Sequence, residues 1–224
     1  MLDLHGFGGQ LLAGAAITLG VALVSGLAGG ALGIIGALAK MYGRRPIRWA
    51  ADAYTTVVRG VPDLLIIFVI YFGGTVTLSK LFDHYVEVSA FAAGSLALAF
   101  VFGAYATEIF RGAMQSVPSG QIEAAQSLGI PPRQVFLRVT LPQSWRLALP
   151  ALGNQWIILV KQTSLVSIVG LDELMRQSAV AAGATRQPFT IYVAAACIYL
   201  ALTLLSTLVL EYAEHRANRP LQRA

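Results

Sequence analysis

Charged residues are scarce in this sequence, since Asp, Glu, Lys and Arg make up only 12% of its 224 residues, about half of their share in soluble domains. A single cysteine, Cys197, excludes an internal disulfide and leaves the redox compartment undetermined. The phosphate-binding sequence G-x-x-x-x-G-K-[ST], the zinc-binding sequence H-E-x-x-H and the C-x-x-C pair are absent. We therefore expect this chain to have no catalytic residues, no metal site and no bound cofactor.

Hydrophobic residues dominate instead, with a share of 56% and a mean hydropathy of +0.67. A helix crosses the hydrocarbon core of a bilayer, ~30 Å thick, with about 20 apolar residues. The long uncharged runs therefore predict an all-α integral membrane protein, and the alternation typical of a transmembrane β-barrel is absent. One domain, residues 1–224, is expected to hold five transmembrane helices, near residues 13–39, 61–79, 88–110, 145–169 and 187–211.

The first and fourth runs do not have the length of a simple span. Residues 6–39 carry no charge, and one helix of that length would measure about 51 Å. We expect a surface segment first, with the span beginning near residue 13; the run is too long for a cleavable signal peptide. The uncharged residues 147–160 are too few, so the fourth helix is expected to continue past Lys161 toward Val169. Small residues at a spacing of four in the first run predict a helix-packing face: Ala22, Gly26 and Gly30.

Basic residues are distributed unequally between the two sides of the expected membrane. With an external N-terminus, twelve of the sixteen Lys and Arg residues are cytoplasmic, whereas Lys80, Arg176 and Arg186 are external. Cytoplasmic loops carry such an excess, so we expect the N-terminus outside and the C-terminus in the cytoplasm. The net charge of +5 agrees with basic loops facing anionic lipid, and no basic stretch interleaved with aromatic residues indicates nucleic-acid binding.

A polar, basic stretch separates two of the apolar runs and is predicted to form a cytoplasmic helix–turn–helix over about residues 118–142. The first helix is expected from Gln121 to Leu128, with Gly129 as the left-handed residue that ends it. Pro131-Pro132 would open a second short helix, which Leu141-Pro142 would end. Such a hairpin is a rigid, water-facing lever that a soluble partner can hold.

Motifs in this stretch resemble the EAA loop of bacterial ABC importer permeases: Glu123-Ala124-Ala125, Gly129 and Val139-Thr140-Leu141-Pro142, with Val139 where the family usually has Ile. Other motifs resemble the amino-acid branch of that family: Arg59-Gly60-Val61-Pro62, Gly103-Ala104-Tyr105 and Lys161-Gln162-Thr163-Ser164-Leu165. Gly60-Val61-Pro62-Asp63 and Gly170-Leu171-Asp172-Glu173-Leu174 are similar to the Q-type permease of the histidine/lysine-arginine-ornithine importers. The resemblance covers roughly residues 10 to 215, and several motifs in order make it specific.

This resemblance implies a permease subunit of an ATP-driven importer that moves amino acids, with basic or polar ones expected, across the bacterial inner membrane. Two cytosolic ATPase subunits would bind ATP and Mg, a related second permease would complete the pathway, and a periplasmic or surface binding protein would deliver the cargo. The residues that the resemblance assigns to ATPase coupling are Glu123, Ala124, Ala125, Gly129, Phe136, Leu141 and Pro142.

Several coupling residues also have plain structural interpretations. Glu123 near a helix N-terminus either pairs with a partner or complements the helix dipole, which is worth about 0.3–1 kcal/mol. Ala124 and Ala125 allow close approach of another backbone, or simply favour a helix. Val135 and Phe136 either fill a partner's groove or pack under the membrane ends of this chain's own helices.

Lys161 is the strongest candidate for the transport pathway, because a charge between apolar runs should face a protein interior or cavity. The polar residues Thr163 and Ser164 follow it and are candidates for the same pathway. The alternative for Lys161 is a structural role, in an ion pair or in a bond to backbone carbonyls. Asp63 is either an N-terminal charge on a helix dipole or an anionic wall for a cationic substrate. Glu108 is a further candidate, although it is also spaced to pair with Arg111 on one helix face.

The alternative function is an ion-coupled secondary amino-acid transporter, for which we would expect inverted repeats and broken helices. No internal repeat is visible, and the basic hairpin would then have no explanation. A membrane enzyme is disfavoured by the missing catalytic motifs. On the external side, Asp172 is predicted to cap a helix of about ten residues with Glu173 in its first turn and Gly183 at its end.

Overall fold

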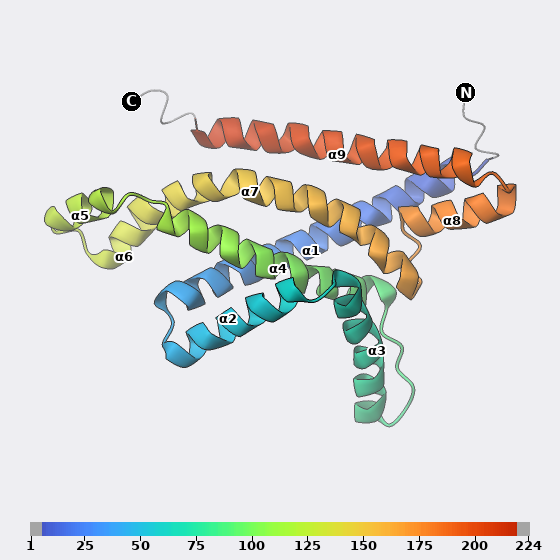
Figure 1. Ribbon diagram of the computed structural model, residues 1–224, viewed down its shortest axis with the longest axis horizontal. Helices are drawn as coiled ribbons and strands as arrows, with labels where there is room; N and C mark the ends of the chain where they lie inside the picture. Colours follow the sequence, from blue (N-terminus) through green and yellow to red (C-terminus); the bar gives the residue numbers. More distant parts are fainter. Residues whose placement is uncertain (1–5, 219–224) are drawn as a thin grey trace.

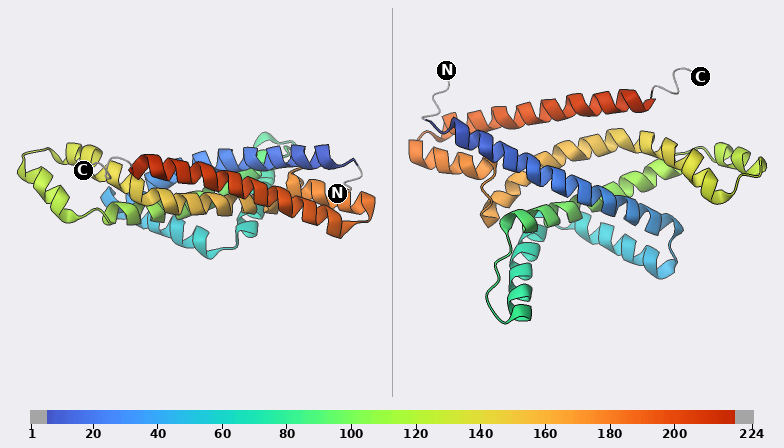
Figure 2. Two further views of the ribbon diagram at one scale, coloured as in Figure 1. Left: turned by 90° about the horizontal axis from the view of Figure 1, so that it is seen from above. Right: turned by 180° about the vertical axis from the view of Figure 1, so that it is seen from behind.

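In the computed structural model, which describes residues 6–218, helices account for nearly all of the chain and those residues form no strand. Four long helices run side by side along the molecule: α1 (Gly8–Tyr42), α4 (Ala90–Gln115), α7 (Leu141–Gln162) and α9 (Pro188–Asn218). The short helices α5 (Ser119–Ser127) and α6 (Pro132–Val135) project beyond them at one end, and α8 (Leu174–Thr185) lies at the other end near the start of α1 (Figures 1 and 2). The basic residues Arg219 and Arg223, which entered the orientation count, lie outside the described residues.

Helix α1 is unbroken from Gly8, so the structure does not separate the expected surface segment from the span. It packs along α4 through a face of small residues, where a side chain on Gly29 or Gly33 would collide with α4 backbone or Ala106. The expected face was partly misplaced, because a Cβ on Gly30 would meet no atom within 4 Å. The helix turn of 3.6 residues, rather than a strict spacing of four, sets which small residues meet α4.

Helix α2 (Arg45–Gly60) is an amphipathic helix that the sequence analysis did not anticipate. It turns back from the end of α1 and runs beside α1 and α4. The chain then breaks at Val61-Pro62, where both residues are extended, and α3 (Asp63–Phe82) leads away from the long helices (Figure 1). Proline lacks the N–H that would continue a helix, which explains the break at this place.

Four helices among residues 6–218 are long and apolar enough to cross a membrane: α1, α3, α4 and α9. They correspond to the first, second, third and fifth expected spans. Helix α7 contains most of the fourth expected span, but Arg146, Gln155 and Lys161 interrupt its apolar sequence. The five-span count therefore stays a prediction.

The predicted end of the second hairpin helix at Leu141-Pro142 is wrong. Helix α6 (Pro132–Val135) continues through a π-helical turn, η1 (Phe136–Thr140), directly into α7. The Leu141 N–H donates to the Phe136 carbonyl, five residues back. A π-turn widens the helix, and Pro142 in the first turn of α7 needs no N–H partner, so the proline is accommodated without a break.

Candidate functional site

Two helices of the chain break next to each other. Helix α3 starts at Asp63 after the Val61-Pro62 break, and α7 gives way after Gln162 to a 3₁₀ helix, η2 (Thr163–Val169). The Gln162 Nε2 donates to Asp63 Oδ2 at 2.5 Å and joins the two breaks. The other amide atom, Gln162 Oε1, is buried and has no partner among the described residues. Broken helices in membrane proteins are tolerated where they face protein or a polar cavity, so this junction is the candidate transport site.

Lys161 precedes this junction and its side chain is exposed, without an ion pair to any residue within 6–218. The Ser164 hydroxyl is half-buried and donates to the Lys161 carbonyl at 2.7 Å. Thr163 is fully buried, and its hydroxyl donates to the Val160 carbonyl at 2.8 Å. Of the expected pathway residues on α7 and η2, Lys161 therefore carries an exposed charge with no ion pair in the described part of the chain, and Thr163 turns inward.

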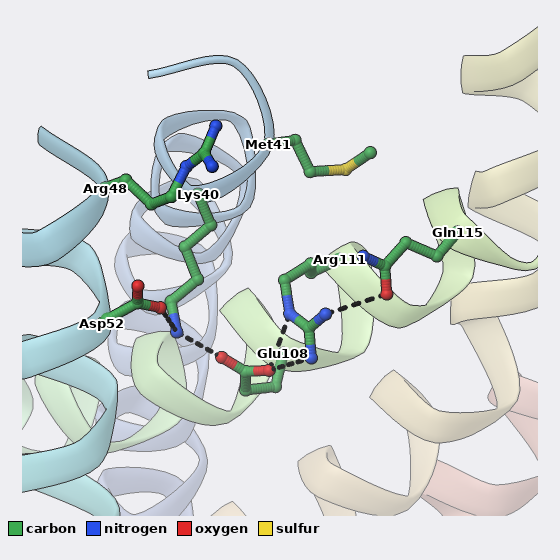
Figure 3. A pocket seen from close by; sticks show the side chains of 7 residues that line it. All are labelled: Lys40, Met41, Arg48, Asp52, Glu108, Arg111 and Gln115. Carbon is green, nitrogen blue, oxygen red and sulfur yellow. Dashed lines mark hydrogen bonds and ion pairs between the residues drawn. The ribbon is translucent and has the colours of Figure 1, made fainter. Parts of the chain in front are cut away.

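Glu108 lies apart from this junction, in a charge cluster formed by α1, α2 and α4 (Figure 3). Lys40 Nζ donates to Glu108 Oε1 and to Thr55 Oγ1, each at 2.6 Å, and lies 2.8 Å from Asp52 Oδ1. Arg111 binds the other Glu108 oxygen through Nε and Nη2, at 2.9 and 2.7 Å. The lining of the 390 Å³ pocket here comprises Lys40, Met41, Arg48, Asp52, Glu108, Arg111 and Gln115. The expected Glu108–Arg111 pair is confirmed, and its carboxylate is already neutralised by two cations.

The hairpin has the turn that the sequence predicted. Helix α5 (Ser119–Ser127) ends before Gly129, whose φ is +76°, and α6 starts at Pro132. Only glycine adopts a positive φ without steric cost, which explains the residue at this turn. Gln143 Nε2 donates a hydrogen bond to Gln121 Oε1 at 2.6 Å. This bond between two side chains ties the base of the hairpin to α7.

The outer face of the hairpin carries the exposed side chains of Glu123 and Ala124, whereas Ala125 is buried. Leu128, at the tip, is 81% exposed, and the sequence analysis did not single it out. An apolar residue directly before the glycine that ends a helix, in an otherwise polar stretch, is the signal that could have found it. The Leu128 side chain is therefore open to solvent at the tip of the hairpin.

Two hydrophobic residues of the hairpin pack against their own chain. Val135 is buried, and the Phe136 ring meets the Tyr42 ring edge to face with centroids 5.7 Å apart. Of the two interpretations offered for Val135 and Phe136, the structure therefore supports internal packing. Leu141 and Pro142 are exposed in the first turn of α7, beyond the base of the hairpin.

At the opposite end of the molecule, Glu173, and not Asp172, caps helix α8 (Leu174–Thr185). Its buried carboxylate accepts hydrogen bonds from the Met175 and Arg176 N–H groups, the Tyr199 hydroxyl and the Thr18 hydroxyl. Burial raises the pKa of the Glu173 carboxyl, while these four hydrogen bonds oppose the shift. The cap prediction was wrong because sequence alone does not show that Thr18 and Tyr199 surround residue 173. The helix also passes through the expected end at residue 183.

Comparisons with known proteins agree with this architecture. Residues 29–219 match the family model described as "Binding-protein-dependent transport system inner membrane component". The nopaline transport system permease protein NocQ of Agrobacterium fabrum is 46% identical over 220 residues, which cover 96% of this chain and 93% of that protein. The histidine/lysine/arginine/ornithine transport system permease protein HisQ of Salmonella typhimurium is 38% identical over 225 residues, covering 99% of each chain.

Solved structures show the same fold. A chain from the crystal structure of an amino acid ABC transporter with histidines superposes with a TM-score of 0.83 at 35% identity, covering 93% of this chain and 94% of that one. A chain from the inward-facing MetNI methionine ABC transporter has a TM-score of 0.75 at 18% identity, covering 94% and 97%. With a matched family model over most of its length and relatives of this similarity, the chain belongs to the family of inner membrane components of binding-protein-dependent transport systems.

Proposed function

We propose that this chain is the transmembrane permease subunit of an ATP-driven importer of amino acids, with histidine, lysine, arginine and ornithine as the expected class of cargo. The observation that carries the proposal is the division of the molecule into two parts. A junction of broken helices holds Asp63 and Gln162 between the long helices, and a polar hairpin with an exposed apolar tip projects at one end (Figure 1). Membership of the transport family and the functions of the relatives NocQ and HisQ support the same function.

The hairpin is the proposed contact with the ATPase subunits. Two such subunits would be present, and they, not this chain, would bind ATP and Mg. Glu123 and Ala124 face outward, and Leu128 at the tip offers an apolar side chain to a groove. Gly129 fixes the angle between α5 and α6. Phe136 braces the hairpin through Tyr42, and the unbroken path from α6 into α7 would transmit movement of the hairpin along α7, with Leu141 and Pro142 in its first turn.

The broken-helix junction is the proposed transport pathway. Asp63 supplies an anionic group for a cationic cargo, Lys161 supplies a cation for a carboxylate, and Ser164 adds a polar group. Transporters commonly place such sites where half-helices end within the membrane. Thr163 supports the bend from inside, and Glu108 holds the ends of α1, α2 and α4 together in its ion-pair cluster.

A second permease subunit, related but not identical, is proposed to complete the pathway, because one chain leaves α3 and α9 largely uncovered. The hairpin and the C-terminus lie in the cytoplasm in this proposal, and the N-terminus and α8 lie outside, where a loaded binding protein docks. Helix α7 then serves as the fourth of five spans despite its polar residues.

The proposal is tested by purifying the complex through a tag on this chain and asking whether ATPase subunits co-elute. Hydrolysis of ATP should rise when a binding protein loaded with arginine is added. Gly129→Val strains the left-handed turn by about 1–3 kcal/mol and should abolish this stimulation. Gly129→Asn, which tolerates positive φ better, should keep much of it.

Both variants should insert normally, which immunoblotting of membranes checks. A complex without ATPase subunits that still transports would support the ion-coupled alternative. Full stimulation in both variants would show that the hairpin turn does not transmit the signal.

A further inference from the structure

A groove of adjoining pockets lies between α1, α7 and α9, outside the proposed pathway, and it meets the coupling residues only at Leu141 and Pro142 in its last pocket. It consists of three adjoining pockets of 450, 300 and 780 Å³. The first shares Trp156 and Leu210 with the second, and Ile34 and Trp145 with the third. Helix α9 packs mainly against α7 and α8 and barely touches α1, which leaves the groove open on one side.

The walls of the groove are apolar over most of its length. Along α9 it extends from Leu202 to Ala217, which corresponds to about 22 Å at 1.5 Å per residue. One leaflet contributes about half of the ~30 Å hydrocarbon core, so the groove has the length of an acyl chain with part of its headgroup. Gly30 lines the groove, and a Cβ there would meet no atom within 4 Å. The small residue thus leaves this space open and does not serve helix packing.

The groove changes character at the end near the hairpin. Arg146 from α7 and Arg216 from α9 line the third pocket together. Neither forms an ion pair with another residue in the part of the chain that the structure describes. Trp145 lies beside them, stacked on Phe110 with ring centroids 6.1 Å apart, and tryptophan favours the boundary between membrane and water. Two cations that have no ion pair among residues 6–218 thus stand at the polar end of an apolar groove, and together they form an amphiphilic site.

We propose that this groove binds an anionic phospholipid, with an acyl chain along Leu23, Trp156 and Leu210 and the phosphate group between Arg146 and Arg216. Arginine pairs bind phosphate through several charge-assisted hydrogen bonds, and basic pockets between transmembrane helices at the cytoplasmic side recognise acidic headgroups. If a second copy of this chain occupied the groove, it would have to place a carboxylate at this point to satisfy both guanidinium groups. A phospholipid needs no such residue, because its phosphodiester carries the negative charge. The site is independent of the cargo that the transporter carries.

The headgroup contact is tested on the whole transporter complex, stripped of lipid in detergent. Phosphatidylglycerol, or phosphatidylcholine as the neutral comparison, is titrated in, and bound lipid is counted by native mass spectrometry. The wild type should retain phosphatidylglycerol preferentially. In R146Q/R216Q this preference should fall roughly 30-fold, since each arginine near the surface contributes about 1 kcal/mol. The matched control is R44Q/R45Q, which removes two exposed arginines from the start of α2 and should keep the preference.

The apolar part is tested by Gly30→Leu, which fills the groove without a backbone collision. Both lipids should then be lost from this site. Ala31→Leu, an exposed neighbour on the same helix, should retain them. Unchanged phosphatidylglycerol binding in R146Q/R216Q and in Gly30→Leu would overturn the proposal. So would loss of the second permease subunit from these variants with lipid binding unchanged, because that result would assign the groove to a protein contact.

Discussion

Helices α4 and α9 are both apolar enough to cross a membrane, but they relate to the rest of the chain in opposite ways. In the most apolar 18-residue window, 67% of α4 is buried within the chain, against 11% of α9. The same contrast separates α1, at 39%, from α3, at 6%. Hydropathy therefore identifies a helix that suits a membrane, but it does not tell whether the helix packs inside its own chain or faces lipid and partner subunits.

Small residues account for the packed pair. Along the contact of α1 with α4, hereafter the α1–α4 seam, Gly29, Gly33 and Gly36 leave no room for a side chain. The Ser25 hydroxyl crosses the seam and donates to the Ser95 carbonyl at 3.0 Å. Within a bilayer, close approach of helix backbones supplies the dispersion contacts that hydrophobic burial supplies in water. Helices α3 and α9 carry larger exposed side chains instead.

The largest effect is expected where the α1–α4 seam is filled. In Gly33→Leu the new side chain would collide with Ala106 and the α4 backbone, and overpacking costs about 1–3 kcal/mol or more where rigid backbone cannot yield. The complex should survive heating in detergent at much lower temperatures, measured by size-exclusion chromatography of the soluble fraction.

Gly73→Leu on α3 is the matched control, because a Cβ there meets no atom within 4 Å. Its thermal survival should stay close to that of the wild type. Equal loss in both variants would remove the proposed difference between the α1–α4 seam and the uncovered helices.

An intermediate effect is expected at Glu173, which joins the sparsely packed α9 to α8 and α1. Glu173→Ala removes the cap of α8, worth about 0.5–2 kcal/mol, and leaves the Thr18 and Tyr199 hydroxyls without this acceptor, at about 1–3 kcal/mol. Thermal survival of the complex should fall clearly. Asp172→Ala, which removes an exposed carboxylate with a 3.3 Å contact to Arg176, should have little effect; the reverse order would show that the buried cap does not hold α9.

The same residue gives a pH dependence with a defined sign. Burial raises the pKa of Glu173 above the ordinary 4.5, so the folded state holds this proton more strongly than the unfolded state. The stabilisation is complete below pH 4.5 and is lost as the pH rises through the raised pKa. Thermal survival of Glu173→Gln should change less over that window than that of the wild type. A steeper profile in the variant would contradict the assignment.

Much of this architecture is predictable from the sequence, for physical reasons that also mark the limit. Uncharged runs reveal α1, α3, α4 and α9 because a bilayer requires long apolar helices, and Gly129 with Pro132 reveals the hairpin because both constrain the backbone. Helix α2 was missed, since its charges divide the apolar residues of an amphipathic helix into short pieces.

The tertiary partners of single polar residues are the part that the sequence does not contain. The bond from Gln162 to Asp63 links positions 99 apart, and the surroundings of Glu173 come from α1 and α9. Local patterns placed Asp63 in the first turn of a helix, but they led us to expect that the helix of Lys161 would continue toward Val169; only the fold shows that α7 ends at Gln162 beside the start of α3. The same holds for Glu108, which the fold assigns to an ion-pair cluster near the hairpin end of α1.

The smallest effect on stability, and a large one on transport, is expected at Lys161. Its exposed side chain has no ion pair among the described residues, so Lys161→Met removes a charge without orphaning a buried partner. Thermal survival should stay near the wild-type value while uptake of labelled arginine into proteoliposomes falls sharply. Lys80→Met, the same change at an exposed position on α3, should leave both unchanged. If Lys161→Met transported normally, the exposed end of α7 would belong to the lipid-facing or subunit-facing surface, like α9. If the variant lost stability instead, the end of α7 would belong with the packed regions, like the α1–α4 seam.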